Sequence, residues 1–354
     1  MTSLASGRVR QRIIIMCLLF TGVMVCLYKI SGDRLFSSSS FGGPKSQYNC
    51  HTTRSIVQQD DLVDTQQPLP LRKHNYMDLN SLNSTRFGKE AKEHVLVLTP
   101  LHNDEQYLDH YFQLLDKTSY PNHLISIGLL VSDSSDDTLE KLYSIVHRLQ
   151  NRWRNRFYEI DVYQKDFHLD EKPDDTSLNS KRATLARAKN FLMTAALREH
   201  HSWVAWVDVK LHSYPPSIIS DLMLVDGDVV VPNCLLKRQD NVFWAFDRNN
   251  WQESDLSLER QQNAAEHEVL MEDYNEYSLG RHLLVDMPTH QGIRIALDGV
   301  GTTFTLVKAT VHREGAIFPP FVYQHELDSE GFAKMVKSMG FSVYGIPSYT
   351  IYHF

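Results

Sequence analysis

The sequence predicts an α/β domain built on a mostly parallel β-sheet, preceded by a membrane anchor and a polar stem. Short apolar runs alternate with amphipathic segments over the last three quarters of the chain, a pattern typical of a parallel sheet covered by helices. A long apolar run lies near the N-terminus, and a Ser-, Gly- and Pro-rich stretch follows it. We therefore predict a cytosolic tail at 1–12, a transmembrane segment at 13–30, a stem at 31–90 and a folded domain at 91–354.

The apolar run at 13–30 is the predicted anchor. As a helix it would extend about 24–27 Å, which suits a thin, early-secretory bilayer. Arg8, Arg10 and Arg12 precede it, so the positive-inside rule places the N-terminus in the cytosol and the rest of the chain in the lumen. A cleavable signal peptide is the alternative, but its apolar core is usually shorter, about 7–15 residues.

Charge is divided unevenly between these parts. The chain of 354 residues has 36 basic and 43 acidic side chains, a formal charge of −7. The first 30 residues hold four basic side chains and no acid, so the other 32 basic and 43 acidic residues leave −11. With 42% hydrophobic residues the chain is too apolar to be wholly disordered, and its acidity argues against a nucleic-acid partner.

Two features bear on a lumenal location. Asn83 begins an Asn-Ser-Thr sequon in a polar stretch, so we predict that it is an N-glycosylation site. Outside the anchor, Cys50 and Cys234 are the two cysteines, and they form either one disulfide or two separate thiols.

The first half of the domain supplies three predicted strands and two helices. Short apolar or β-branched runs indicate strands at His94–Thr99, Ile125–Val131 and Tyr158–Tyr163. Apolar residues at helical spacing indicate a helix at Glu105–Lys117, and a second follows the capping residues after Val131 and runs to about Leu149.

The next elements continue the alternation. The acid-rich stretch Lys165–Ser180 reads as a loop, followed by a helix at Arg182–Leu197 and a strand at Trp203–Asp208. Pro215 and Pro216 open another helix, and a turn then leads to a short strand at Asp228–Val231.

Several polar residues fall at the carboxyl ends of predicted strands. These are Thr99 with Pro100, then Asp133, then Asp208. Ligands of parallel α/β sheets bind beyond the carboxyl ends of the strands, so these residues should converge on one crevice.

No glycine-rich phosphate loop follows the first strand, in either the dinucleotide or the ATPase form. A nucleotide would instead be held by acidic and hydroxyl groups on its base and ribose, and its diphosphate would need a metal or basic side chains. Arg187 and Lys189 are the nearest basic candidates, and a solvated helix face is the competing interpretation.

Longer strings resemble one family, the fungal Golgi α-mannosyltransferases that form mannan polymerase. The resemblance covers nearly all of 94–354 in order, including the segments Val97–Glu105, Gly128–Asp136, Ala186–Asn190 and Phe246–Ser254. It also includes Leu297–Gly301, Val343–Pro347 and the anchor-and-stem layout.

This resemblance implies a GT-A fold, GDP-mannose as donor, Mn²⁺ as cofactor and a retaining transfer to the outer-chain mannan of N-glycans. It also implies other family subunits as partners in a Golgi complex. Through its motifs it implies Thr99, Pro100, Asp133, Arg187 and Asn190 on the nucleotide side.

The metal motif departs from the family pattern. Where the family has Asp-x-Asp, this chain has Asp208-Val209-Lys210, which replaces a carboxylate by an ammonium. A metal could remain on Asp208 and on His353, which matches the family position that completes the metal shell. Alternatively Lys210 itself contacts the diphosphate in a metal-independent enzyme, or the site is inactive.

Asp298 and Asp247 are candidates for the reacting sugar or the acceptor. Asp298 precedes two glycines that would let the backbone approach a ligand, although it could be a plain turn residue. Asp247 lies among aromatic residues, which suits a sugar site or ordinary core packing. His200 and His201 end a helix, where imidazoles suit the dipole, so a ligand role is not expected.

We therefore expect a Golgi or ER/Golgi single-pass protein that transfers mannose from GDP-mannose. A structural subunit with little or no activity is the alternative because of Lys210, and a glycan-binding module is a third class.

Overall fold

The computed structural model describes residues 78–354, apart from the segments 169–177, 238–242, 271–278 and 291–293. The predicted tail at 1–12 and anchor at 13–30 lie outside these residues. Within the described part of the chain, no helix combines the length and apolar character needed to cross a membrane.

Residues 78–90, the last part of the predicted stem, lie among the described residues, and some of them bond to the domain. Ser84 Oγ donates a hydrogen bond to the Ser202 carbonyl (2.7 Å), and the Thr85 amide donates to the Glu93 carboxylate (3.0 Å). These residues lack apolar periodicity, and polar bonds rather than hydrophobic burial attach them.

A ten-stranded mixed sheet forms the centre of the described domain, in the order β10-β12-β6-β11-β4-β1-β2-β3 with β5 and β7 at its margins. Its strands are β1 (His94–Leu101), β2 (Ile125–Val131), β3 (Glu159–Gln164), β4 (His201–Val207), β5 (Leu211–Ser213), β6 (Val229–Lys237), β7 (Phe243–Ala245), β10 (Ile295–Ala296), β11 (Phe304–Lys308) and β12 (Val343–His353). β8 (Trp251–Gln252) and β9 (His282–Leu283) form a separate pair.

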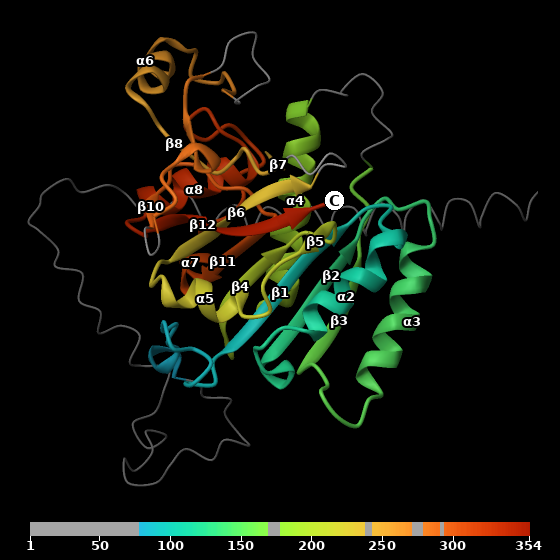
Figure 1. The fold of residues 1–354 in the computed structure, drawn as a ribbon. Coiled ribbons are helices and arrows are strands. Elements are labelled where there is room, and N and C mark those ends of the chain that lie inside the picture. Colours follow the sequence, from blue (N-terminus) through green and yellow to red (C-terminus); the bar gives the residue numbers. More distant parts are fainter. Residues whose placement is uncertain (1–77, 169–177, 238–242, 271–278, 291–293) are drawn as a thin grey trace, which may run out of the picture. The chain divides into compact units, whose positions relative to one another are not determined.

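Strand direction determines where functional residues meet. β1 is parallel to β2 and β4, and β12 is parallel to β6. β11 is antiparallel to both β4 and β6, so β4, β6 and β12 run in the same direction. The carboxyl ends of β1, β2, β4 and β12 therefore share one edge of the sheet, where Figure 1 also shows the C-terminus.

Helices cover both faces of the sheet. They are α2 (Leu108–Asp116), α3 (Thr138–Gln150), α4 (Leu178–Ala196), α5 (Ile218–Leu224), α6 (Asp255–Asn263), α7 (Ala309–Arg313) and α8 (Asp328–Ser338), with short 3₁₀ turns at Leu79–Ser81, Glu105–Tyr107, Asn122–Leu124 and Leu284–Asp286. Side chains of α2, α3 and α5 share one core with the sheet, and those of α4, α7 and α8 share a second core on its other face (Figure 1). Every residue of β2 and β4 is buried, because both faces of these strands are covered.

Most predicted elements are confirmed, and several boundaries differ. α4 begins at Leu178 rather than Arg182, and β6 extends well past Val231. β1 continues through Pro100 to Leu101. Proline is tolerated there because the pairing of β1 with β4 ends at Leu98, so the missing amide removes no ladder bond on that side.

Candidate nucleotide-sugar site

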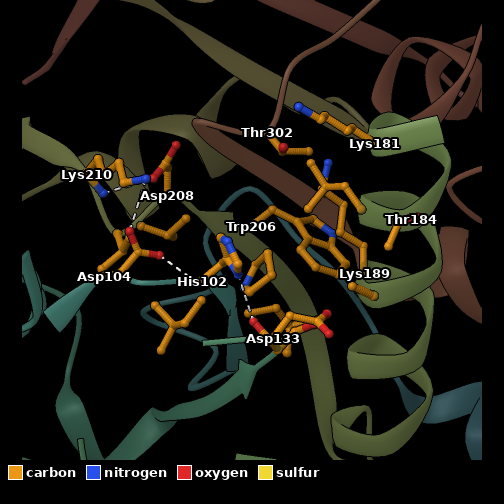
Figure 2. Close-up of a pocket in the computed structure, with 18 residues that line it drawn as sticks. His102, Asp104, Asp133, Lys181, Thr184, Lys189, Trp206, Asp208, Lys210 and Thr302 are labelled. Carbon is orange, nitrogen blue, oxygen red and sulfur yellow. Dashed lines mark hydrogen bonds and ion pairs between the residues drawn. The ribbon is translucent and has the colours of Figure 1, made fainter. Parts of the chain in front are cut away.

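A cavity of about 340 Å³ lies at the carboxyl edge of the parallel strands. The loops after β1, β2 and β4 form one wall, and α4 forms the opposite wall (Figure 2). Pro100, Asp133, Asp208 and Lys210 line it, which confirms that these polar strand ends converge. Its size is within the range of small-molecule sites.

Asp208 follows β4 directly, where a backbone bond from its amide to the Thr303 carbonyl (2.9 Å) fixes it. Its Oδ1 accepts the Lys210 amide (2.9 Å), and its Oδ2 lies 3.4 Å from Nε2 of His353. Burial alone would raise the pKa of Asp208, but His353 and the Lys210 amide outweigh it, so the pKa lies below its ordinary value.

His353 ends β12 beside Asp208 and is almost completely buried. Its Nδ1 lies 3.0 Å from the oxygen of Phe354, which only accepts, so Nδ1 carries the proton and donates. In the neutral ring Nε2 then presents a lone pair toward Asp208 and has no hydrogen-bond partner. Phe246 stacks on the imidazole at 3.6 Å between ring centroids and fixes its plane.

A buried lone pair facing a carboxylate calls for a positive group between them, and either a proton on Nε2, which would form an ion pair with Asp208, or a divalent cation would supply one. Imidazole nitrogen and carboxylate oxygen are both suitable ligands for Mn²⁺. The donor set of Asp208 and His353 therefore fits a metal, and the two predicted ligands are brought together. Lys210 cannot supply a third ligand, because an ammonium has no lone pair.

The ammonium of Lys210 has a partner of its own. Its Nζ lies 3.0 Å from Oδ1 of Asp104, a carboxylate only 4% exposed in the loop after β1 (Figure 2). Asp104 Oδ2 accepts the His102 amide (2.9 Å). Burial would lower the pKa of Lys210, but the hydrogen bond and charge of Asp104, with the charge of Asp208, raise it overall. The amine therefore stays charged at neutral pH.

Asp133 follows β2 in a left-handed backbone conformation (φ 48°) and lines the cavity. Its carboxylate accepts the amides of Phe167 (3.0 Å) and His168 (2.9 Å) and the Ser132 hydroxyl (2.7 Å). These bonds outweigh the effect of burial and lower the pKa of Asp133. Asp133 therefore presents a fixed anionic acceptor, as a ribose or base contact requires.

The geometry invites comparison with known proteins. The model of the Anp1 family matches residues 73–322, about 70% of the chain. The chain belongs to the Anp1 family.

Individual members of the Anp1 family support this. The mannan polymerase II complex anp1 subunit of Schizosaccharomyces pombe is 35% identical, over 78% of this chain and 68% of that protein. The mannan polymerase complex subunit mnn9 of the same yeast is 34% identical, over 78% of this chain and 84% of its own length. The mannan polymerase II complex ANP1 subunit of Saccharomyces cerevisiae is 33% identical, and the chain spans 58% of it.

Solved structures are more distant. The mannosyltransferase PcManGT from Pyrobaculum calidifontis, solved with GDP-Man and Mn²⁺, is 13% identical with a TM-score of 0.41. That alignment covers 73% of this chain and 56% of the other.

Three of the predicted nucleotide contacts do not line the cavity of this Anp1-family chain. Thr99 is fully buried, and its hydroxyl is engaged by Tyr111 Oη (2.7 Å) and the Val207 carbonyl (2.6 Å). Arg187 is exposed and lies over the Phe167 ring (5.4 Å).

Asn190 bonds both the amide and the carbonyl of Phe318 (2.9 and 2.6 Å), so it joins α4 to the segment before α8. Lys189, the other basic candidate, does line the cavity. However, it is 2% exposed and its ammonium is paired with Asp328 at 2.8 Å.

The two predicted sugar-side acids are also engaged elsewhere. Asp247 accepts the Thr303 hydroxyl (2.6 Å), and a Cβ on Gly301 would lie 1.9 Å from its Oδ1. Burial raises the pKa of Asp247. Asp298 forms an ion pair with Lys337 and accepts the Glu253 amide (2.8 Å). Neither lines the cavity, and their role at the sugar or acceptor stays a prediction.

Some cavity residues escaped the sequence analysis. Asp104, His102 and Trp206 line the cavity together with Lys181 and Thr302. Asp104 lies three residues past the end of β1 within a matching family segment, which is a signal that could have identified it. Thr302 comes from a loop distant in sequence, and no local pattern indicates it.

A second cluster of possible ligands lies at the opposite edge of the sheet. Among the described residues, Glu159, His200 and His201 have ligand atoms within 4.8 Å of one another. Nδ1 of His201 accepts the Arg198 amide (3.0 Å), so Nε2 of the neutral ring carries a proton toward Glu159. A protonated nitrogen is not a ligand, so His201 in this tautomer offers Glu159 a proton. The sequence placed both histidines at the end of a helix, but α4 ends at Ala196 and His201 begins β4.

The remaining predicted sites are isolated. Asn83 is exposed and therefore accessible to modification. Cys234 is a buried thiol whose pKa is raised by burial. Cys50 lies outside the described residues, so a disulfide between Cys50 and Cys234 stays a prediction.

Proposed function

We propose that this protein is a GT-A-like mannosyltransferase subunit of a mannan polymerase complex, which transfers mannose from GDP-mannose to N-glycan mannan with retention. One observation carries the proposal. Asp208 and His353, on strands far apart in the sequence, meet at 3.4 Å beside a cavity of ligand size. The names of the Anp1-family relatives support mannan as the product and other subunits as partners.

Different residues would contact the diphosphate and the nucleoside of the sugar donor. Asp208 and His353 would hold Mn²⁺, which would neutralise charge on the diphosphate. Asp133, fixed by three hydrogen bonds, would accept a hydroxyl or amino group of the nucleoside, and Pro100 and Trp206 provide apolar wall beside it. Asp247 and Asp298 lie outside the cavity and are engaged by Thr303 and Lys337, so a role for them in the transfer step stays a prediction.

A transfer assay tests the proposal. The full-length protein, co-expressed with a family partner, should transfer radiolabelled mannose from GDP-mannose to an α-mannoside acceptor when Mn²⁺ is present. Asp208→Asn should lower turnover by about 100-fold or more, since it removes a charged ligand. Asp161→Asn is the matched control, because Asp161 pairs with Arg198 at the other edge of the sheet. Equal turnover in the two variants would contradict the proposal.

Lys210 favours a second candidate function, that of a subunit that binds GDP-mannose but does not transfer its mannose. One ammonium in the motif removes a metal ligand, and its Asp104 partner holds it in the site. If this candidate is correct, Asp208→Asn abolishes binding of GDP-mannose, and all mannose transfer by the wild-type complex comes from the partner subunit. Inactivating the partner's own metal site separates the two candidates.

We also propose that the protein is a single-pass Golgi membrane protein, anchored through residues 13–30 with its folded domain in the lumen. The exposed sequon at Asn83 supports this orientation. Endoglycosidase treatment should shift the mobility of the wild-type protein and not of Asn83→Gln. A sequon that stays unmodified in a protein exposed to cytosolic protease would contradict the lumenal orientation.

A further inference from the structure

The Lys210–Asp104 pair occupies the place where the family pattern has a second metal-ligating carboxylate. The backbone of Lys210 is tied to both metal-ligand candidates. Its amide donates to Asp208, and its carbonyl accepts the Phe354 amide (3.2 Å), next to His353. The Lys210 side chain therefore starts from a fixed point between the ends of β4 and β12.

The position of the ammonium is also fixed. Asp104 holds it at 3.0 Å, and the Tyr107 ring lies 5.7 Å from it. Asp104 itself is buried, and its Oδ1 has no hydrogen-bond donor apart from this ion pair. An unpaired buried carboxylate is costly, so Asp104 retains the ammonium rather than releasing it to solvent.

The contact with Asp104 does not use all the N–H groups of the Lys210 ammonium. An ammonium has three N–H groups, and Asp104 accepts at one oxygen. The Lys210 side chain is 40% exposed and lines the cavity. Its remaining N–H groups are therefore available to an anion in the cavity while the Asp104 contact persists.

The neighbouring charges explain why such a cation is needed. Three carboxylates, Asp104, Asp133 and Asp208, line the same cavity. Two other lysines line it, both on α4: the ammonium of Lys189 is paired with Asp328 away from the acids of the cavity, and Lys181 is exposed on the opposite wall. A diphosphate lying against the three acids would be repelled by them unless Lys210 or a metal offset their charge.

We propose that Lys210 is a resident cation for the donor diphosphate, positioned by Asp104, which makes nucleotide binding only weakly dependent on metal. This inference rests on the proposed function, because it assumes a nucleoside diphosphate in the cavity. Lys210 contributes a charge-assisted contact to a phosphate oxygen, and Asp104 acts as its positioning residue.

Calorimetric titration of the full-length protein with GDP tests this, in Mn²⁺ and in EDTA. The wild type should bind GDP in EDTA within about tenfold of its affinity in Mn²⁺. Lys210→Met should lose about tenfold or more in EDTA, the scale of one charge-assisted bond. Lys210→Asp should bind well only with Mn²⁺. Lys141→Met is the matched control, since Lys141 pairs with Asp109 (3.2 Å) outside the cavity.

Asp104→Asn gives an independent readout. Without Asp104 the ammonium loses the contact that positions it, so GDP affinity in EDTA should fall by about tenfold and Asp104→Glu should restore it, while affinity in Mn²⁺ should change less. Wild-type binding that vanishes in EDTA but is normal in Mn²⁺ would overturn the inference and leave the proposed function intact. Absence of GDP binding in both conditions would overturn the proposed function as well.

Discussion

A histidine lies next to a carboxylate at each end of the parallel strands, but the two pairs differ in their chemistry. The carboxyl ends of these strands form the carboxyl edge of the sheet, and their amino ends form the amino edge. At the carboxyl edge, Nε2 of His353 lies 3.4 Å from Asp208, and at the amino edge, Nε2 of His201 lies 3.8 Å from Glu159. The rings differ at their other nitrogen. Nδ1 of His353 donates to Phe354, whereas Nδ1 of His201 accepts from the Arg198 amide.

This difference determines which edge can bind a cation. In a neutral imidazole, donation from Nδ1 leaves a lone pair on Nε2, whereas acceptance at Nδ1 leaves the proton on Nε2. The surroundings reinforce the contrast, because the Arg198 side chain lies 3.5 Å from Glu159 and Arg313 lies against the His201 carbonyl. Ligand-type residues close together are therefore insufficient evidence of a metal site.

The largest expected effect removes both cations of the carboxyl edge. The double variant His353→Gln/Lys210→Met should weaken GDP binding in Mn²⁺ by about 100-fold, because it loses the metal and the ammonium together. Calorimetry measures the affinity. His201→Gln at the amino edge is the control and should bind like the wild type. A double variant with near-normal affinity would remove the functional contrast between the edges.

The next effect concerns packing behind the carboxyl edge. Gly301→Ala should destabilise the domain by about 2 kcal/mol, because its Cβ would overlap Asp247, whose partner Thr303 supports Asp208. Urea unfolding measures this change. Adding Asp247→Ala should relieve part of the loss, so strictly additive effects would contradict the overlap.

The histidines of the amino edge should make the free energy of unfolding depend on pH. Burial and neighbouring positive groups lower the pKa of His201 to about 3, and burial also lowers the pKa values of His94 and His200. Because unfolding restores values near 6.5, their stabilising contribution is complete above that pH. For His201 it is lost as pH falls from about 6.5 toward 3, at up to about 1.4 kcal/mol per pH unit, and His94 and His200 add to the loss as pH falls below about 6.5.

Urea unfolding between pH 7 and pH 4 measures this loss. His201→Gln should reduce the slope of unfolding free energy against pH, since one buried titrating ring is gone. The same substitution at the carboxyl edge, His353→Gln, provides the comparison. Identical slopes for wild type and His201→Gln would show that His201 titrates normally.

The smallest effect is expected for Glu159→Gln. Glu159 contacts Arg198 in a partly exposed ion pair, and such pairs contribute about 0–1 kcal/mol. Thermal unfolding should therefore change little, and GDP affinity in Mn²⁺ should stay unchanged. A clear loss of GDP affinity would indicate that the amino edge takes part in function.

Much of the fold could be predicted from the sequence, because the signals were local. The run at 125–131 is wholly buried and apolar, so its strand boundaries match the prediction. The strand at 228–231 was predicted too short because β6 continues through Pro232 and the polar Asn233, where pairing with β12 replaces hydrophobic patterning. That pairing joins segments over 100 residues apart.

The candidate site could be predicted in part, because some of its residues follow strands that have local sequence signals. Asp133 and Asp208 end local strands, and strand direction brought them to the cavity. Thr99 does not line the cavity because its hydroxyl faces Tyr111, an inward orientation that strand ends do not reveal. Asp247 and Asp298 lie outside the cavity, and their partners, Thr303 and Lys337, come from distant segments. Tautomers likewise depend on hydrogen bonds that no motif encodes.

Mn²⁺ binding measured by electron paramagnetic resonance tests the central claim most directly. With GDP present, the wild type and the Glu159→Gln/His201→Gln variant should both reduce the signal of aqueous Mn²⁺, whereas Asp208→Asn/His353→Gln should not. Only the carboxyl edge should bind the ion. Retained binding in the Asp208→Asn/His353→Gln variant, together with its loss in Glu159→Gln/His201→Gln, would contradict it.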